Sequence, residues 1–161
     1  MIDPAQLAGA FERNVNVIKM QSAGLSNDDS LIQLPFRGNC LNWVVGHITA
    51  NRNLVLQALG EAPALGADAI ARYQRGSEPI DGGAVGLLTL EELLETLERA
   101  QAGIAAGLQR ASHDDLAREV PGSQNHITVG QRLFFLYFHE TYHVGQTELL
   151  RQLAGKNDAV I

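Results

Sequence analysis

Hydrophobic residues recur at spacings of three and four along four long stretches of the chain, the pattern of a helix with one buried face. The pattern predicts helices over residues 4–20, from 39 or 40 to 59, from 89 to the residues before Ser112, and over 128–155. Polar residues suited to capping stand at their starts: Asp3, Asn39, Thr89 and Thr128. The sequence shows no convincing strand pattern, so we predict an all-α protein built as a four-helix bundle.

The connections between these helices are rich in turn-forming residues. Residues 22–38 form a polar link, and residues 60–88 contain repeated glycine and proline with a short helix over Ala67–Arg75. The second link is long enough to cross the bundle, so that the second and third long helices run parallel. A short helical turn over His113–Arg118 and a loop lead into the last helix. We expect residues 1–161 to form one domain.

The composition is that of an ordinary globular protein, with 161 residues of which 45% are hydrophobic. A net charge of −6 argues against binding to the phosphate backbone of nucleic acids, which requires clustered Lys and Arg. The sequence contains no apolar run of about 18 residues for a membrane and no secretory signal, so we expect a cytoplasmic protein. Cys40 is the only cysteine, and we expect it to pack in the core.

Two histidines in the last predicted helix, His139 and His143, are four residues apart and therefore lie on one helix face. A helix can offer two nitrogen ligands to one metal ion in this way. His47 lies at the centre of the inward face of the second predicted helix, and bundle interiors often hold metal sites built from facing helices. Three imidazoles leave a coordination position open, which is typical of a catalytic metal site. We therefore predict that these three histidines bind one metal ion.

Other polar residues of the last helix allow more than one interpretation. The inward stripe that we predict for this helix consists of Arg132, Phe135, His139, Tyr142, His143, Gln146, Leu150 and Leu153. Arg132 and Gln146 share the face of the histidines, and either could orient an anionic ligand or a bound water. Arg132 could equally form an ion pair at the end of the bundle. His113 and His126 lie outside the periodic patterns, and we expect both at the surface.

The segment His139–His143 also fits the HExxH motif of zinc proteases, in which Glu140 would act as the general base. No histidine follows His143, so the third zinc ligand of those enzymes is missing downstream. Glu140 lies about 100° around the helix from His139 and could instead face a neighbouring helix. Histidines that are buried and hydrogen-bonded without a metal are the remaining alternative, but such burial is costly unless their nitrogens have partners.

The chain resembles the DinB/YfiT-like superfamily of metal-dependent proteins. The resemblance lies in the long link and in three segments: Asn42–Ile48, Thr128–Gly130 and His139–Gln146. The last segment is a His-x-x-x-His followed by x-Gly-Gln. The resemblance covers nearly the whole chain, and the last segment is its most specific part. Family members often have arginine where this chain has Val144, which removes a charge beside the site and leaves the three histidines intact.

The resemblance implies an up-down-down-up four-helix bundle, often a homodimer, with one divalent metal, usually zinc or nickel, held by His47, His139 and His143. Some relatives are S-transferases or isomerases that use a low-molecular-weight thiol such as bacillithiol or mycothiol. We therefore expect a metal-dependent thiol S-transferase-type enzyme that acts on a small molecule. Two alternatives remain: a metal-binding, stress-associated bundle without turnover, and a metal-dependent hydrolase that uses Glu140.

Overall fold

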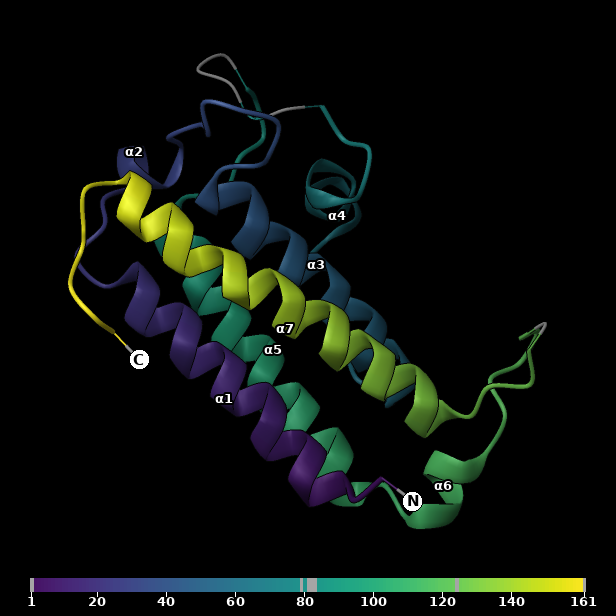
Figure 1. Ribbon diagram of the computed structural model, residues 1–161. Helices are drawn as coiled ribbons and strands as arrows, with labels where there is room; N and C mark the ends of the chain where they lie inside the picture. The colour runs from purple at the N-terminus through teal and green to yellow at the C-terminus, as the bar shows by residue number, and fades with distance from the viewer. Residues whose placement is uncertain (1, 79, 81–83, 124, 161) are drawn as a thin grey trace.

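Four long helices, α1 (Pro4–Ser22), α3 (Leu41–Ala58), α5 (Leu90–Arg110) and α7 (Val129–Leu153), form a bundle in the computed structural model (Figure 1). α1 and α7 run in one direction, and α3 and α5 run in the other, so the order is up-down-down-up. The structure describes residues 2–78, 80, 84–123 and 125–160, and within these it contains helices and one isolated bridge but no strand. The all-α four-helix bundle is therefore confirmed.

The four helices form a ring in which each packs against two others. α3 packs against α5 and α7, and α1 packs against the same two helices, so α1 and α3 lie diagonally across the bundle. Apolar side chains from all four fill the interior in two clusters, one towards each end of the bundle. None of the helices in the described part of the chain has the length and apolar character needed to cross a membrane.

Capping chemistry explains where most of the long helices begin. Thr89 with Glu92, and Thr128 with Gln131, form reciprocal capping boxes, and Asp3 accepts hydrogen bonds from the first turn of α1. The prediction of Asn39 as a cap is wrong, because Cys40 occupies that position and makes no side-chain capping bond. The start of α3 therefore depends on packing, since Cys40 and the residues after it are fully buried.

The described parts of the connections contain three short helices: α2 (Asn27–Ser30), α4 (Ala67–Tyr73) and α6 (His113–Ala117). α2 was predicted only as a turn; Ser26 and Asp29 form a capping box there, which closes one helical turn. α4 matches the short helix predicted in the long link, and it packs on α3. Residues 79 and 81–83 of that link lie outside the described residues.

Tyr73, at the end of α4, seats the long link against α3. Its ring is fully buried and lies so close to Gly46 that a Cβ atom there would approach the ring carbons to 2.2 Å. Only glycine at position 46 allows this approach, and the next residue along α3 is His47. The long link therefore covers the face of α3 that carries the first predicted metal ligand.

The predicted inward stripe of α7 is wrong for its aromatic members. Phe135 and Tyr142 are 62% and 64% exposed, on the solvent side of the helix. The buried stripe includes Leu150, as predicted, but its other members are Leu133, Leu136, Glu140, Val144 and Thr147, with Val129, Gly130 and Arg151 towards the helix ends. Both sides of α7 carry large apolar residues, so hydrophobic spacing alone did not identify which side faces the bundle. Leu54 of α3 is likewise an apolar residue that is partly exposed, whereas its neighbours Val55 and Leu56 are buried.

Candidate metal centre

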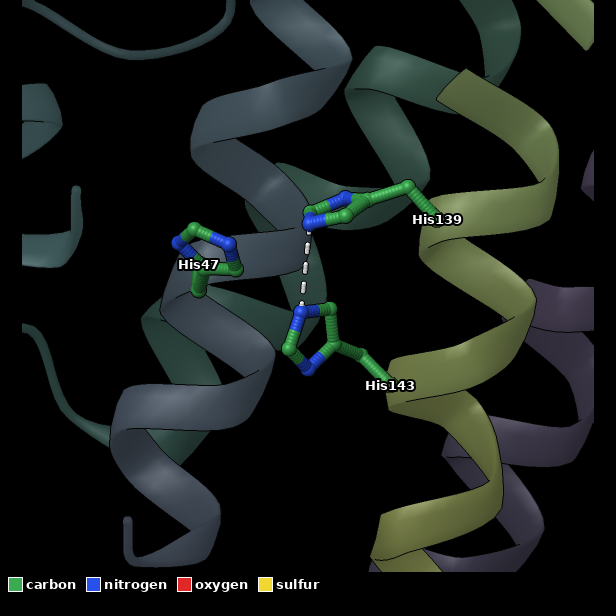
Figure 2. A group of neighbouring side chains, drawn as sticks. All are labelled: His47, His139 and His143. Carbon is green, nitrogen blue, oxygen red and sulfur yellow. Dashed lines mark hydrogen bonds between the residues drawn. The ribbon is translucent and has the colours of Figure 1, made fainter. Parts of the chain in front are cut away.

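Three histidines from two antiparallel helices meet between α3 and α7 (Figure 2). His47 comes from α3, and His139 and His143 come from successive turns of α7. One ligand nitrogen from each ring lies within 4.8 Å of the corresponding nitrogens of the other two. The Nε2 atoms of His139 and His143 are 3.3 Å apart. The structure thus brings together the three residues that the sequence predicts as one site; we call them the histidine cluster.

His47 is held in one orientation by its surroundings. Its Nδ1 lies 2.7 Å from the carbonyl oxygen of Tyr73, and a carbonyl only accepts, so Nδ1 carries the proton. This tautomer leaves the lone pair on Nε2. The ring also stacks on Trp43, with ring centroids 4.6 Å apart and planes within 10° of parallel. A carbonyl that fixes the tautomer of a histidine is the usual arrangement behind a metal ligand.

His143 is fixed in the same way by a different partner. Its Nδ1 lies 2.8 Å from Oε1 of Gln146, one turn further along α7, and this oxygen accepts the Nδ1 proton. The Nε2 of His143 therefore bears a lone pair, and Nε2 of His139 donates its proton to it. For a metal to bind at all three Nε2 atoms, His139 must move its proton to Nδ1.

Asn51 completes the contacts of the cluster. Its amide nitrogen donates to the backbone oxygen of His47 at 2.8 Å and lies 3.2 Å from Nε2 of the same residue. The two lone pairs that face the cluster are thus met only by N–H groups of Asn51 and His139. These two N–H groups lie where a metal ion would bind the lone pairs, and either group can turn away.

Burial favours the neutral form of two members of the histidine cluster, His47 and His139. Removal from water lowers the pKa of His47 to about 4; the Tyr73 carbonyl opposes this shift, and His143 and His139 add to it. Burial, followed by the nearby His143, also lowers the pKa of His139. Neutral imidazoles are the form that binds metal, so both rings are ready to coordinate at neutral pH.

The donor set fits a borderline divalent ion. Three neutral imidazoles, without carboxylate or thiolate, suit zinc, nickel, copper or iron and leave a coordination position open. In the described ranges, the histidine cluster is the one group of three or more His, Cys, Asp or Glu residues close enough to share an ion. Cys40 packs in the core, as predicted, and His113 and His126 lie exposed.

The other predicted site residues take different positions. Gln146 contacts the cluster through His143. Arg132 instead lines a hollow with Leu54 and Pro121 near the other end of α3. It precedes His139 by seven residues, which corresponds to about 10 Å along the helix. Arg132 is therefore remote from the histidine cluster along α7.

Glu140 points into the bundle, where it is 2% exposed. Its Oε2 accepts a hydrogen bond from Nε of Arg52 at 2.9 Å, and its Oε1 accepts one from Nη2 of Arg52 at 2.6 Å. Asn14 of α1 donates to Oε1 as well, at 3.2 Å. With both oxygens engaged, Glu140 is poorly placed to take a proton from a bound water. The short HExxH pattern is explained by this structural contact.

Arg52 was missed in the sequence, although a signal was present. It is the only charged residue between Asn39 and Leu59, a stretch that is otherwise apolar or neutral. A single charge in a helix that is apolar on most sides is often buried with a partner, because an unpaired buried charge is very unfavourable. Spacing within one helix could not identify that partner as Glu140, which lies in another helix.

Comparison with known proteins supports the fold and the family. A sequence model of the DinB superfamily matches residues 22–147, a span that contains all three histidines of the cluster. A conserved protein from Enterococcus faecalis has a similar structure, with a TM-score of 0.75 over 97% of this chain and 99% of that one. The two share 15% sequence identity, so the likeness concerns the fold alone. The search of curated proteins found no match.

Proposed function

This chain belongs to the DinB superfamily, and from that membership and the histidine cluster we propose that it binds one divalent metal ion through His47, His139 and His143. The observation that carries the proposal is the approach of three imidazole nitrogens to within 4.8 Å of one another. Two further contacts support it: the oxygens of Tyr73 and Gln146 hold protons on Nδ1 and leave Nε2 free to bind. Zinc or nickel is the proposed metal.

The proposed activity is that of a thiol S-transferase-type enzyme acting on a small molecule in the cytoplasm. When bound, the ion would act as a Lewis acid and hold a low-molecular-weight thiol as its thiolate. The chain contributes three neutral ligands and leaves a coordination position open for such a thiol. His139 and His143 are only half-buried, which gives a small molecule access from the solvent side.

A metal-binding bundle without turnover is the second candidate. It is favoured by the way the cluster joins separate parts of the fold, since His47 is bonded to the link at Tyr73 and faces two histidines of α7. A bound ion would tie these parts together and stabilise the bundle. The third candidate, a hydrolase with Glu140 as base, has less support because Arg52 engages both oxygens of that carboxylate.

Elemental analysis of protein purified without an affinity tag tests the metal site. We expect about one equivalent of divalent metal in the wild type and none in His47→Ala. His113→Ala, which removes an exposed histidine, is the matched control and should retain the metal. Unchanged metal content in His47→Ala would show that the proposed ligand set is incorrect.

A conjugation assay with several cellular thiols separates the two main candidates. The transferase predicts metal-dependent consumption of one thiol and an electrophile, lost in His47→Ala and kept in His113→Ala. With the metal supplied at a saturating concentration, Glu140→Gln should abolish turnover only in a hydrolase. Absence of turnover with every thiol, in a protein that holds one metal ion, would favour the non-catalytic bundle.

A homodimer is also part of the proposal, and an exposed face of α7 supports it. Phe135, Phe138, Tyr142 and Leu149 follow a three- and four-residue spacing along this face, and Phe134 lies at its edge. All five are more than half exposed. At about 200 Å² per aromatic side chain, they expose on the order of 500 Å² in each copy, near the lower limit for a stable interface. Uncovered apolar patches of this size usually mark a contact surface.

The same face can pair with itself. If two α7 helices meet antiparallel around a twofold axis near residue 140, Phe135 of each copy lies opposite Gly145 of the other. Gly145 has open space around its Cα, so it can receive the ring. Phe138→Asp should therefore give a monomer by analytical ultracentrifugation, whereas Phe36→Asp, at an equally exposed ring elsewhere, should not. A Phe138→Asp protein that remains a dimer would place the interface on another face.

A further inference from the structure

A fully buried arginine connects all four long helices of the bundle. Arg52 of α3 is 0% exposed. Its Nη2 donates to the backbone oxygen of Phe11 in α1 at 2.9 Å, and its Nη1 donates to Oε1 of Gln101 in α5 at 2.9 Å. Its Nε and Nη2 donate to the two oxygens of Glu140 in α7. One guanidinium therefore bonds to each of the other three helices; we call Arg52, Glu140, Gln101 and Asn14 the arginine cluster.

The arginine cluster lies next to the histidine cluster along both α3 and α7, the two helices that carry the histidines. Arg52 follows His47 by five residues in α3, about 7.5 Å along the helix axis. Glu140 directly follows His139 in α7. A change in how Arg52 meets Glu140 therefore moves the two halves of the histidine cluster relative to each other.

The apolar side chains that α3 and α7 contribute to the core do little to fix the register of the two helices. Many are aliphatic: Val44, Ile48 and Val144 belong to one apolar cluster, and Val55 and Leu136 belong to the other. Aliphatic contacts are not directional, and cores made of them tolerate rearrangement when the volume is kept. An arginine and a carboxylate joined by two hydrogen bonds have a fixed geometry.

A shifted register would separate this pair. Sliding α3 along α7 by one turn, about 5.4 Å, would leave two charges in the interior without their partners. Asn14 of α1 also restricts the position of α7, because its amide donates hydrogen bonds to both Glu140 and Thr141. The polar contacts of the arginine cluster are thus compatible with one arrangement of the two helices, the one in which the three histidines meet.

We propose that Arg52 and Glu140 are positioning residues: their buried pair sets the register of α3 against α7 that brings His47 to His139 and His143. This role rests on the proposed metal site and gives Glu140 a purpose in that site without contact to metal or substrate. Loss of the pair should weaken and distort metal binding even where the bundle still folds.

The test compares metal binding in folded variants, with Co²⁺ as a coloured probe of the site. In Arg52→Met/Glu140→Leu, both charges are replaced together by apolar side chains of similar length, a change that buried ion pairs often tolerate. Arg151→Met is the matched control. Arg151 is another buried arginine, which bonds Gln21, Ala23 and Asp158 at the far end of α7.

We expect the double variant to retain its helical circular dichroism, to bind Co²⁺ at least about tenfold more weakly than the wild type, and to show an altered visible spectrum of the bound ion. Arg151→Met should lose stability while keeping the wild-type affinity and spectrum. A purely structural role for the pair would not change the spectrum of a folded variant.

Wild-type affinity and spectrum in the folded double variant would overturn the proposal. If that variant does not fold, Glu140→Gln decides, because it keeps the shape of the side chain and removes its charge; the same loss of affinity supports the role, and wild-type binding overturns it. A wild type that binds no Co²⁺ would instead refute the metal site, and the positioning role falls with it. Equal binding by wild type and variants would refute the positioning role alone.

Discussion

Two polar clusters lie side by side between α3 and α7, and they differ in how their polar atoms are satisfied. In the arginine cluster, the guanidinium of Arg52 and both oxygens of Glu140 have close partners within the protein. In the histidine cluster, the Nδ1 atoms of His47 and His143 have carbonyl partners, while the Nε2 lone pairs of the same two residues meet only the N–H groups of Asn51 and His139.

The difference separates a structural contact from a binding site. Buried charges that satisfy one another need nothing further, and they hold helices in place. Three imidazole nitrogens brought together, two with lone pairs and one with a proton that can move to Nδ1, form an arrangement that a cation can satisfy better than the protein does. The two clusters should therefore respond differently to substitution, metal and acid.

The largest effect should follow from breaking the arginine cluster on one side only. Arg52→Met leaves the carboxylate of Glu140 buried without its partner, and we expect a loss of about 3–5 kcal/mol in the free energy of unfolding. Urea denaturation followed by circular dichroism measures it. Arg110→Met, which removes an exposed pair with Glu61, should cost no more than about 1 kcal/mol. A loss that small in Arg52→Met would mean that Glu140 finds other partners or water.

Metal should stabilise the histidine cluster and leave the arginine cluster unaffected. With free Zn²⁺ at one hundred times its dissociation constant, we expect about 2.7 kcal/mol of added stability in the wild type, because only the folded chain presents all three ligands. His47→Ala should gain none under the same conditions. Thermal unfolding with and without Zn²⁺ makes the comparison, and equal stabilisation of both proteins would contradict it.

Removing the partner of a histidine should affect metal binding more than the fold. Gln146→Leu deletes the oxygen that holds the Nδ1 proton of His143, and we expect metal affinity to fall about 10- to 100-fold. Stability of the metal-free protein should change by less than about 0.5 kcal/mol. Calorimetric titration measures the affinity. Gln152→Leu, an exposed position on the same helix, is the control and should bind as the wild type does.

Acid should destabilise the metal-free protein through His47. Its pKa is lowered to about 4 from an ordinary value of 6.5, so below pH 6.5 the unfolded chain takes up a proton that the folded chain does not. The free energy of unfolding should therefore fall as the pH drops from 6.5 towards 4, by about 1 kcal/mol between pH 6.5 and pH 5.5. Urea denaturation at several pH values shows the slope. His47→Gln should flatten it, and an unchanged slope would assign the effect to other groups.

Local signals in the sequence were enough to predict the bundle. The capping residues Thr89 and Thr128 sit where α5 and α7 begin, and the i, i+4 spacing of His139 and His143 fixes both rings on one side of α7. These features depend on residues within one or two turns of one another. The pairing with His47 followed from its central place on a second helix.

Long-range contacts could not be predicted from spacing. The partner of Glu140 is 88 residues away in the chain, and the carbonyl that orients His47 belongs to Tyr73 in the long link. Hydrophobic spacing also wrongly placed Phe135 and Tyr142 on the inward face of α7, because both are apolar but exposed. In each case the answer depends on which neighbouring element approaches a residue, and the pattern within one helix does not contain that information.

A crystal of the protein grown with Zn²⁺, and measured on both sides of the zinc absorption edge, tests the central claim most directly. The account predicts one strong anomalous peak between α3 and α7, about 2.0–2.1 Å from Nε2 of His47, His139 and His143. Nδ1 of His47 should remain bonded to the oxygen of Tyr73. No peak at the histidine cluster, or zinc bound there without His47, would contradict the account.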